Sequence, residues 1–91
     1  MDNAVRMFTI VKNVIDEFNP MGLLPEAPND EFNSESRKIA GQISINSTVE
    51  EIADIILNVL SKAFDEKFEY KSCKESAEKI YYAINNTYRT L

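Results

Sequence analysis

The longest run of helically spaced apolar residues lies between Thr48 and Phe64. Apolar positions recur there every three to four residues, which places them on one side of an α-helix. That side consists of Val49, Ile52, Ile56, Val59, Leu60 and Ala63, widened by Ile55 and Phe64. Thr48 and Glu51 have the spacing of a capping box, so the helix is predicted to begin directly after Thr48. Because so apolar a helix must be covered by other elements, we expect the rest of the chain to pack around it.

A first helix is predicted from about Ala4 to Phe18, with Asp2 or Asn3 as its cap. Its apolar side is Ala4, Phe8, Val11, Ile15 and Phe18, flanked by Val5 and Val14. Asn19 and Pro20 should end it, because proline disfavours helical geometry in the residue before it.

The stretch 19–29 contains all three prolines of the chain and is predicted to be a loop. It also carries three apolar side chains, Met21, Leu23 and Leu24. Two interpretations stay open. These side chains either fold over the core as a cover, or they form an apolar tip that contacts a partner.

A second helix is predicted from about Asp30 to Gln42, with Asn29 or Asp30 as its cap. Its buried side is Phe32, Ile39, Ala40 and Ile43. The residues that follow are predicted to connect it to the long helix, with Ile43 and Ile45 held against the core.

A fourth helix is predicted to begin at Ser72, where Glu75 again has capping-box spacing. A turn over 67–71, anchored by Phe68 and Tyr70, should precede it. The apolar side of this helix is Cys73, Ala77, Ile80, Tyr81, Ile84, Tyr88 and Leu91, and Tyr82 points away from it. The whole pattern predicts one all-α domain over 1–91, a compact four-helix domain with a proline-rich loop between helices 1 and 2.

Charge is unevenly distributed along the chain, whose formal net charge is −5. Residues 13–61 hold nine acids and two bases, whereas residues 67–91 hold five bases and three acids. This balance argues against direct binding of nucleic acid, which requires a basic footprint. An acidic centre favours a cationic protein partner, although acidity also serves solubility.

Catalytic chemistry has few candidate residues in this sequence. The chain has no histidine and one cysteine, Cys73, which we expect to be a buried packing residue. Glu50, Glu51 and Asp54 could form a carboxylate pair or a divalent-ion site, but acids in a first helical turn are explained by the helix dipole and the capping box. We therefore predict neither an enzyme nor a cofactor or metal site.

The sequence predicts a cytoplasmic location. A lone cysteine fits a reducing compartment, the first residues lack the pattern of a signal peptide, and no stretch approaches the length of a membrane span.

The basic residues Lys67, Lys71, Lys74 and Lys79 alternate with acids and are predicted to form a solvated face.

Three stretches carry a resemblance: Asp16 to Gly22 (DEFNPMG), Asp30-Glu31-Phe32, and Thr48 to Ala53 (TVEEIA). With them the chain resembles a family of small all-helical bacterial proteins of unknown function, marked by a [DN]-P-x-G loop. In size and charge it is also similar to immunity proteins of bacterial toxin systems, including contact-dependent growth inhibition. The second resemblance implies a protein that neutralises a toxin.

The function expected from charge and resemblance is that of an immunity protein. It would occlude a basic toxin domain, which we expect to be a nuclease, by acidic surface complementarity. The predicted partner-binding residues are Glu17, Leu23, Leu24, Glu26, Asp30, Glu31 and Glu35. The alternative is a small interaction or oligomerisation module without a toxin partner, in which the apolar loop or Tyr82 mediates self-association.

Overall fold

The computed structural model describes residues 3–20 and 32–88, which form four α-helices and no strand. These are α1 (Asn3–Phe18), α2 (Asn33–Ala40), α3 (Val49–Phe64) and α4 (Tyr70–Tyr88). The predicted all-α, four-helix fold is confirmed. No described helix is both long enough and apolar enough to span a membrane.

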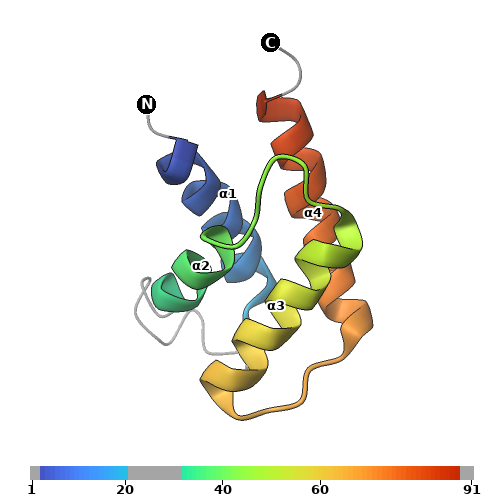
Figure 1. Ribbon diagram of the computed structural model, residues 1–91. Coiled ribbons are helices and arrows are strands. Elements are labelled where there is room, and N and C mark those ends of the chain that lie inside the picture. Colours follow the sequence, from blue (N-terminus) through green and yellow to red (C-terminus); the bar gives the residue numbers. More distant parts are fainter. Residues whose placement is uncertain (1–2, 21–31, 89–91) are drawn as a thin grey trace.

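The helices pack in a closed circuit in which each contacts two others (Figure 1). α1 packs against α2 and α4, and α3 packs against the same two helices from the opposite side. α4 runs antiparallel to both α1 and α3, and the segment 41–48 carries the chain from the end of α2 across to the start of α3 (Figure 1). Each helix turns buried residues towards the shared core, as the pattern of α3 requires.

The core takes a fully buried isoleucine from each helix: Ile15, Ile39, Ile56 and Ile80. Beside them, four phenylalanines form a chain of edge-to-face contacts from Phe32 through Phe64 and Phe68 to Phe18, with ring centroids 6.0 to 6.4 Å apart. Such pairs contribute about 0.5–1.5 kcal/mol beyond the burial of their area. Phe68 thereby anchors the α3–α4 connection, as predicted.

The boundaries of α3 agree with the prediction. The Glu51 N–H donates to Thr48 Oγ1 at 3.1 Å, and the Thr48 N–H donates to Glu51 Oε1 at 2.8 Å, which completes the capping box. The helix ends at Phe64, and Asp65 follows in the left-handed conformation with φ 51° and ψ 43°. Asn19 ends α1 in the same conformation, with φ 52°.

Two predicted helix starts are wrong. α2 begins at Asn33, because Phe32 has a non-helical backbone (φ −103°, ψ 16°) and its carbonyl accepts the first helical hydrogen bond, from Ser36. α4 begins at Tyr70, with the Cys73 N–H bonded to the Glu69 carbonyl, so Ser72 lies inside the helix and caps nothing. The predicted caps Asp2, Asn29 and Asp30 lie outside the described residues, and Asn3 lies inside α1.

Four predicted core contacts are also corrected. Val5, Ile45 and Tyr70 are exposed, to 51%, 46% and 41%, and Ala63 is exposed as well. Val5 lies at the margin of its helical stripe, Ala63 lies in the last turn of α3, and Ile45 sits in an exposed turn. Met7 and Ser36 are buried where the pattern did not place a core residue. These differences do not alter the helix arrangement.

Candidate protein-binding surface

Only two of the predicted partner-binding residues lie in the described part of the chain. Glu17, near the end of α1, is exposed, and Glu35, in the first turn of α2, is half-buried. The others, Leu23, Leu24, Glu26, Asp30 and Glu31, lie outside the described residues. Of the predicted partner-binding residues, the structure therefore places only Glu17 and Glu35.

Glu17 already has a partner within the chain. Its Oε1 accepts a hydrogen bond from Lys79 Nζ, an ion pair that links α1 to α4. Glu35 forms no ion pair with another described residue, and no contact joins it to Glu17. The structure does not bring these two carboxylates together into one site.

Three acids, Glu50, Glu51 and Asp54, lie in the first turns of α3 and have two different environments. Glu51 belongs to the capping box, where its side chain is bonded to the backbone of Thr48. Glu50 and Asp54 are exposed, lie one helical turn apart, and form no ion pair with any described residue. No group of three or more potential metal ligands occurs among residues 3–20 and 32–88.

A pair of tyrosines on α4 adjoins this end of α3. Tyr82 is the most exposed of the large apolar side chains described, at 63%, and its ring lies edge-on to that of Tyr81 with centroids 5.9 Å apart. Tyr81 is half-buried against the core. Tyr81 and Glu50 line the same shallow depression, of about 330 Å³, together with the residues that lead into α3.

A second exposed carboxylate, that of Glu78, lies on α4 itself. Glu78 precedes Tyr82 by four residues, so the two lie one turn apart on the same face of α4. Glu78 is exposed and forms no ion pair with another described residue. We call Glu50, Glu78, Tyr81 and Tyr82 the tyrosine–carboxylate surface. It combines an ordered, exposed aromatic ring with two uncompensated negative charges.

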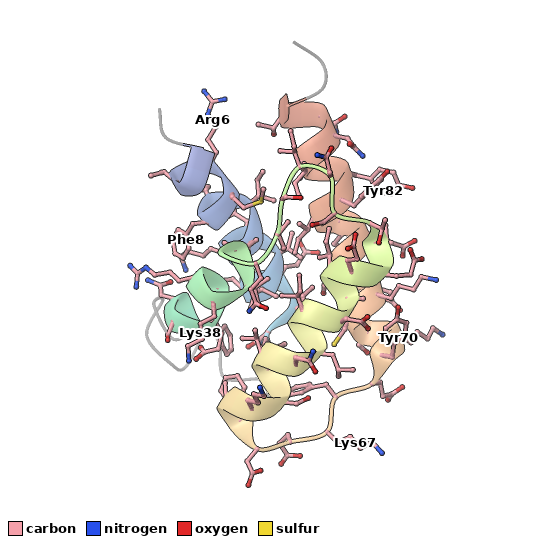
Figure 2. The ribbon with its side chains drawn as sticks, viewed as in Figure 1. Arg6, Phe8, Lys38, Lys67, Tyr70 and Tyr82 are labelled. Carbon is pink, nitrogen blue, oxygen red and sulfur yellow. The ribbon has the colours of Figure 1, made fainter. Side chains whose placement is uncertain are left out.

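The N-terminal end of α4 carries a second exposed tyrosine, with charged side chains of both signs around it. Tyr70 lines a depression of about 500 Å³ with Lys67, Glu69, Lys71 and the half-buried Phe68. Figure 2 shows Tyr70 near the start of α4 and Tyr82 nearer its end, with Lys67 on the connection that precedes the helix. The predicted solvated lysines, Lys67, Lys71, Lys74 and Lys79, are all exposed. Two bases and one acid therefore surround Tyr70, whereas an acid lies one turn from Tyr82.

Cys73 is a core residue, as predicted. Its side chain is fully buried between the helices, and burial raises the pKa of the thiol because the thiolate would be desolvated. A protonated, inaccessible thiol is a poor nucleophile.

Sequence reasoning named Tyr82 only as a side chain that points away from the core, and read Glu78 as part of a solvated face. The i, i+4 spacing of Glu78 and Tyr82 was the available signal. The proximity of Tyr81 to Glu50 depends on the packing of α4 against α3, which periodicity does not reveal.

No family model matches this chain, and no curated protein or solved structure matches it. The resemblance around the Asn19-Pro20-Met21-Gly22 segment stays a prediction.

Proposed function

We propose that this chain is an immunity protein that binds a basic toxin domain, most simply a nuclease, and occludes its active cleft. The observation that carries the proposal is the set of exposed carboxylates on α3 and α4, Glu50, Asp54 and Glu78, which no described base neutralises. Nucleases that bind phosphate backbones present cationic clefts. Carboxylates fixed on packed helices steer such a partner towards the complex and complement its charge once bound.

The mechanism requires no chemistry from this chain. Binding alone inhibits the toxin when the acidic domain covers the cleft and excludes the nucleic acid. Steering by exposed charges acts on the association rate and weakens as salt is added, because the Debye length falls from about 10 Å at 0.1 M to about 3 Å at 1 M.

Growth protection tests the proposal directly. The gene of this chain is co-expressed with the gene immediately upstream of it in its native genome, which we expect to encode a basic toxin domain, and growth is compared with that of cells expressing the upstream gene alone. An upstream gene that encodes no such domain would count against the proposal. We expect growth to be restored and the two proteins to co-purify. Toxin that kills at every level of this chain would refute the proposal.

The sequence-derived contact face has its own test. Reversing the charge at Asp30 and Glu31, both to lysine, should lower the association rate with the toxin and flatten its salt dependence if these residues make the contact. An unchanged rate would remove this face from consideration without affecting the proposed function.

A second candidate function, self-association without a toxin partner, is favoured by Val5. This exposed side chain lines two largely apolar depressions, one with Phe8 and Ala40 and the other with Ile10 and Thr87. Exposed apolar surface of this kind marks many oligomer contacts. Sedimentation velocity over a hundredfold range of concentration decides the matter, since a constant monomer value would rule this alternative out.

A further inference from the structure

We infer that the tyrosine–carboxylate surface is where this protein docks its partner, and that the occupant is a cationic, arginine- or lysine-rich segment of that protein. The inference rests on the proposed function, because it names the contact through which a basic partner would be held. It places the contact on α3 and α4 and away from the proline-rich loop.

The ring of Tyr82 has the properties of an interface anchor. It is the most exposed large apolar side chain described, yet its edge-to-face contact with Tyr81 restrains its orientation before any partner arrives. Tyr81 is in turn packed against the core, so the pair is supported by the fold. A pre-ordered aromatic side chain loses less conformational entropy on binding, which is one reason tyrosine is enriched among residues that dominate interface affinity.

The charges around this ring select a cationic occupant. Glu78 lies one turn from Tyr82, and Glu50 shares a depression with Tyr81. A guanidinium or ammonium group placed over the Tyr82 ring would gain a cation–π interaction and the attraction of Glu78, while Glu50 lies beside the neighbouring Tyr81. Two bases of α4 lie near Glu78: Lys79 is paired with Glu17, and Lys74, four residues before Glu78, forms no ion pair with it.

Tyr70 provides an internal comparison that separates charge from aromatic exposure. It is an exposed tyrosine on the same helix, but two bases, Lys67 and Lys71, and one acid, Glu69, line its depression. Tyr82 instead has the acid Glu78 one turn away. A cationic segment should therefore prefer Tyr82. A partner that recognised exposed aromatic rings alone would use both tyrosines.

The test uses the full chain, labelled with ¹⁵N, and the peptide nona-arginine as a defined cationic probe. Amide shifts on titration should concentrate at residues 46–50 and 78–82. Tyr82→Ala and Glu78→Gln should each raise the dissociation constant about fivefold, the scale of one lost cation–π or charge contact. Tyr70→Ala and Glu66→Gln, in exposed positions at the other end of α4, should leave it unchanged. Circular dichroism checks that each variant is folded.

Two results would overturn the inference. In the first, the amide shifts are spread evenly over the exposed acids and Tyr82→Ala binds nona-arginine with the same dissociation constant as the native chain. In the second, nona-arginine does not bind at all. Failure of the proposed function gives a different pattern. If the native chain binds nona-arginine through Tyr82 but does not protect cells, the surface stands and the immunity role falls. If the chain protects and Tyr82→Ala binds the toxin as tightly as the native chain does, the role stands and the surface falls.

Discussion

Thr48 is the residue on which the start of α3 depends. Its side chain and backbone together satisfy two hydrogen-bonding groups that an uncapped helix would leave without a partner. Thr48→Ala should therefore lower the free energy of unfolding by about 1 kcal/mol, measured by urea denaturation.

Thr9 is the matched control for Thr48. Its hydroxyl donates to the Val5 carbonyl 2.9 Å away, an acceptor on the exposed side of α1. Thr9→Ala should change the free energy of unfolding by less than about 0.5 kcal/mol. Equal losses in the two variants would show that the capping box contributes nothing specific.

Cys73 gives the stability a predictable pH dependence. Because burial raises the pKa of its thiol, the folded state keeps the proton at pH values where the unfolded state loses it. The resulting stability is fully present below the unfolded pKa of about 8.5 and is lost as pH rises through the folded pKa. The free energy of unfolding should decline as pH rises above about 8.5.

Replacing the thiol isolates this contribution. Cys73→Ala should remove the decline due to this thiol, although it lowers stability at every pH by deleting a buried side chain. Urea titrations at pH 7, 8.5 and 10 measure both effects. A decline in the variant as steep as in the native chain would assign the pH dependence to other groups.

The two capping-box spacings show what local sequence could and could not predict. Thr48 and Glu51 form the expected box, whereas Ser72 and Glu75, with a serine in the same relation to a glutamate, lie inside α4. The difference is set by Phe68, whose contacts with Phe18 and Phe64 fix where the α3–α4 connection ends. The Phe18–Phe68 contact joins residues fifty positions apart, so a window along the chain does not contain it.

At the scale of elements, α3 is followed directly by Asp65, whose backbone conformation glycine would adopt more easily. Asp65 adopts a left-handed conformation that glycine enters without steric cost. Asp65→Gly should therefore raise the free energy of unfolding by about 0.5–1 kcal/mol, measured by thermal and urea denaturation.

The same substitution inside α3 should act in the opposite direction. Asp54 is exposed in the body of the helix, where glycine is the poorer helix former by a few tenths of a kcal/mol. Asp54→Gly should therefore be slightly destabilising. If both substitutions raise the free energy of unfolding, the cause is an effect on the unfolded chain and not the left-handed conformation of Asp65.

Periodicity located the helices better than it located their surfaces. Four helices were predicted and four are found, because each carries buried residues at helical spacing. Whether Val5, at the margin of its stripe, or Ala63, in the last turn of α3, is covered depends on how closely the neighbouring helix approaches, which spacing alone does not define. The same limit applies to the candidate surface, since Glu50 and Tyr81 meet only through the packing of α3 on α4.

At the scale of the whole molecule, the closed circuit of contacts predicts that the chain unfolds as one unit. α1 touches α2 and α4, and α3 touches the same two helices, so the loss of any helix uncovers the apolar sides of two others. A core shared in this way favours two-state unfolding. The prediction of a single domain over 1–91 therefore has a direct experimental consequence.

The tyrosines make this consequence measurable, because all four lie in α4. Ile15→Val in α1 should cost about 0.5–1.5 kcal/mol. That loss should lower the melting temperature by several degrees, at about 4–8 °C per kcal/mol for a chain of this size. If the domain is one unit, the melting temperatures measured by tyrosine fluorescence and by far-ultraviolet circular dichroism must fall by the same amount, although the change is in α1. Val5→Ala, on the exposed side of α1, should move neither signal by more than about 2 °C. If the melting temperature measured by dichroism falls while that measured by tyrosine fluorescence stays unchanged, α1 unfolds independently of α4. The chain would then contain two unfolding units.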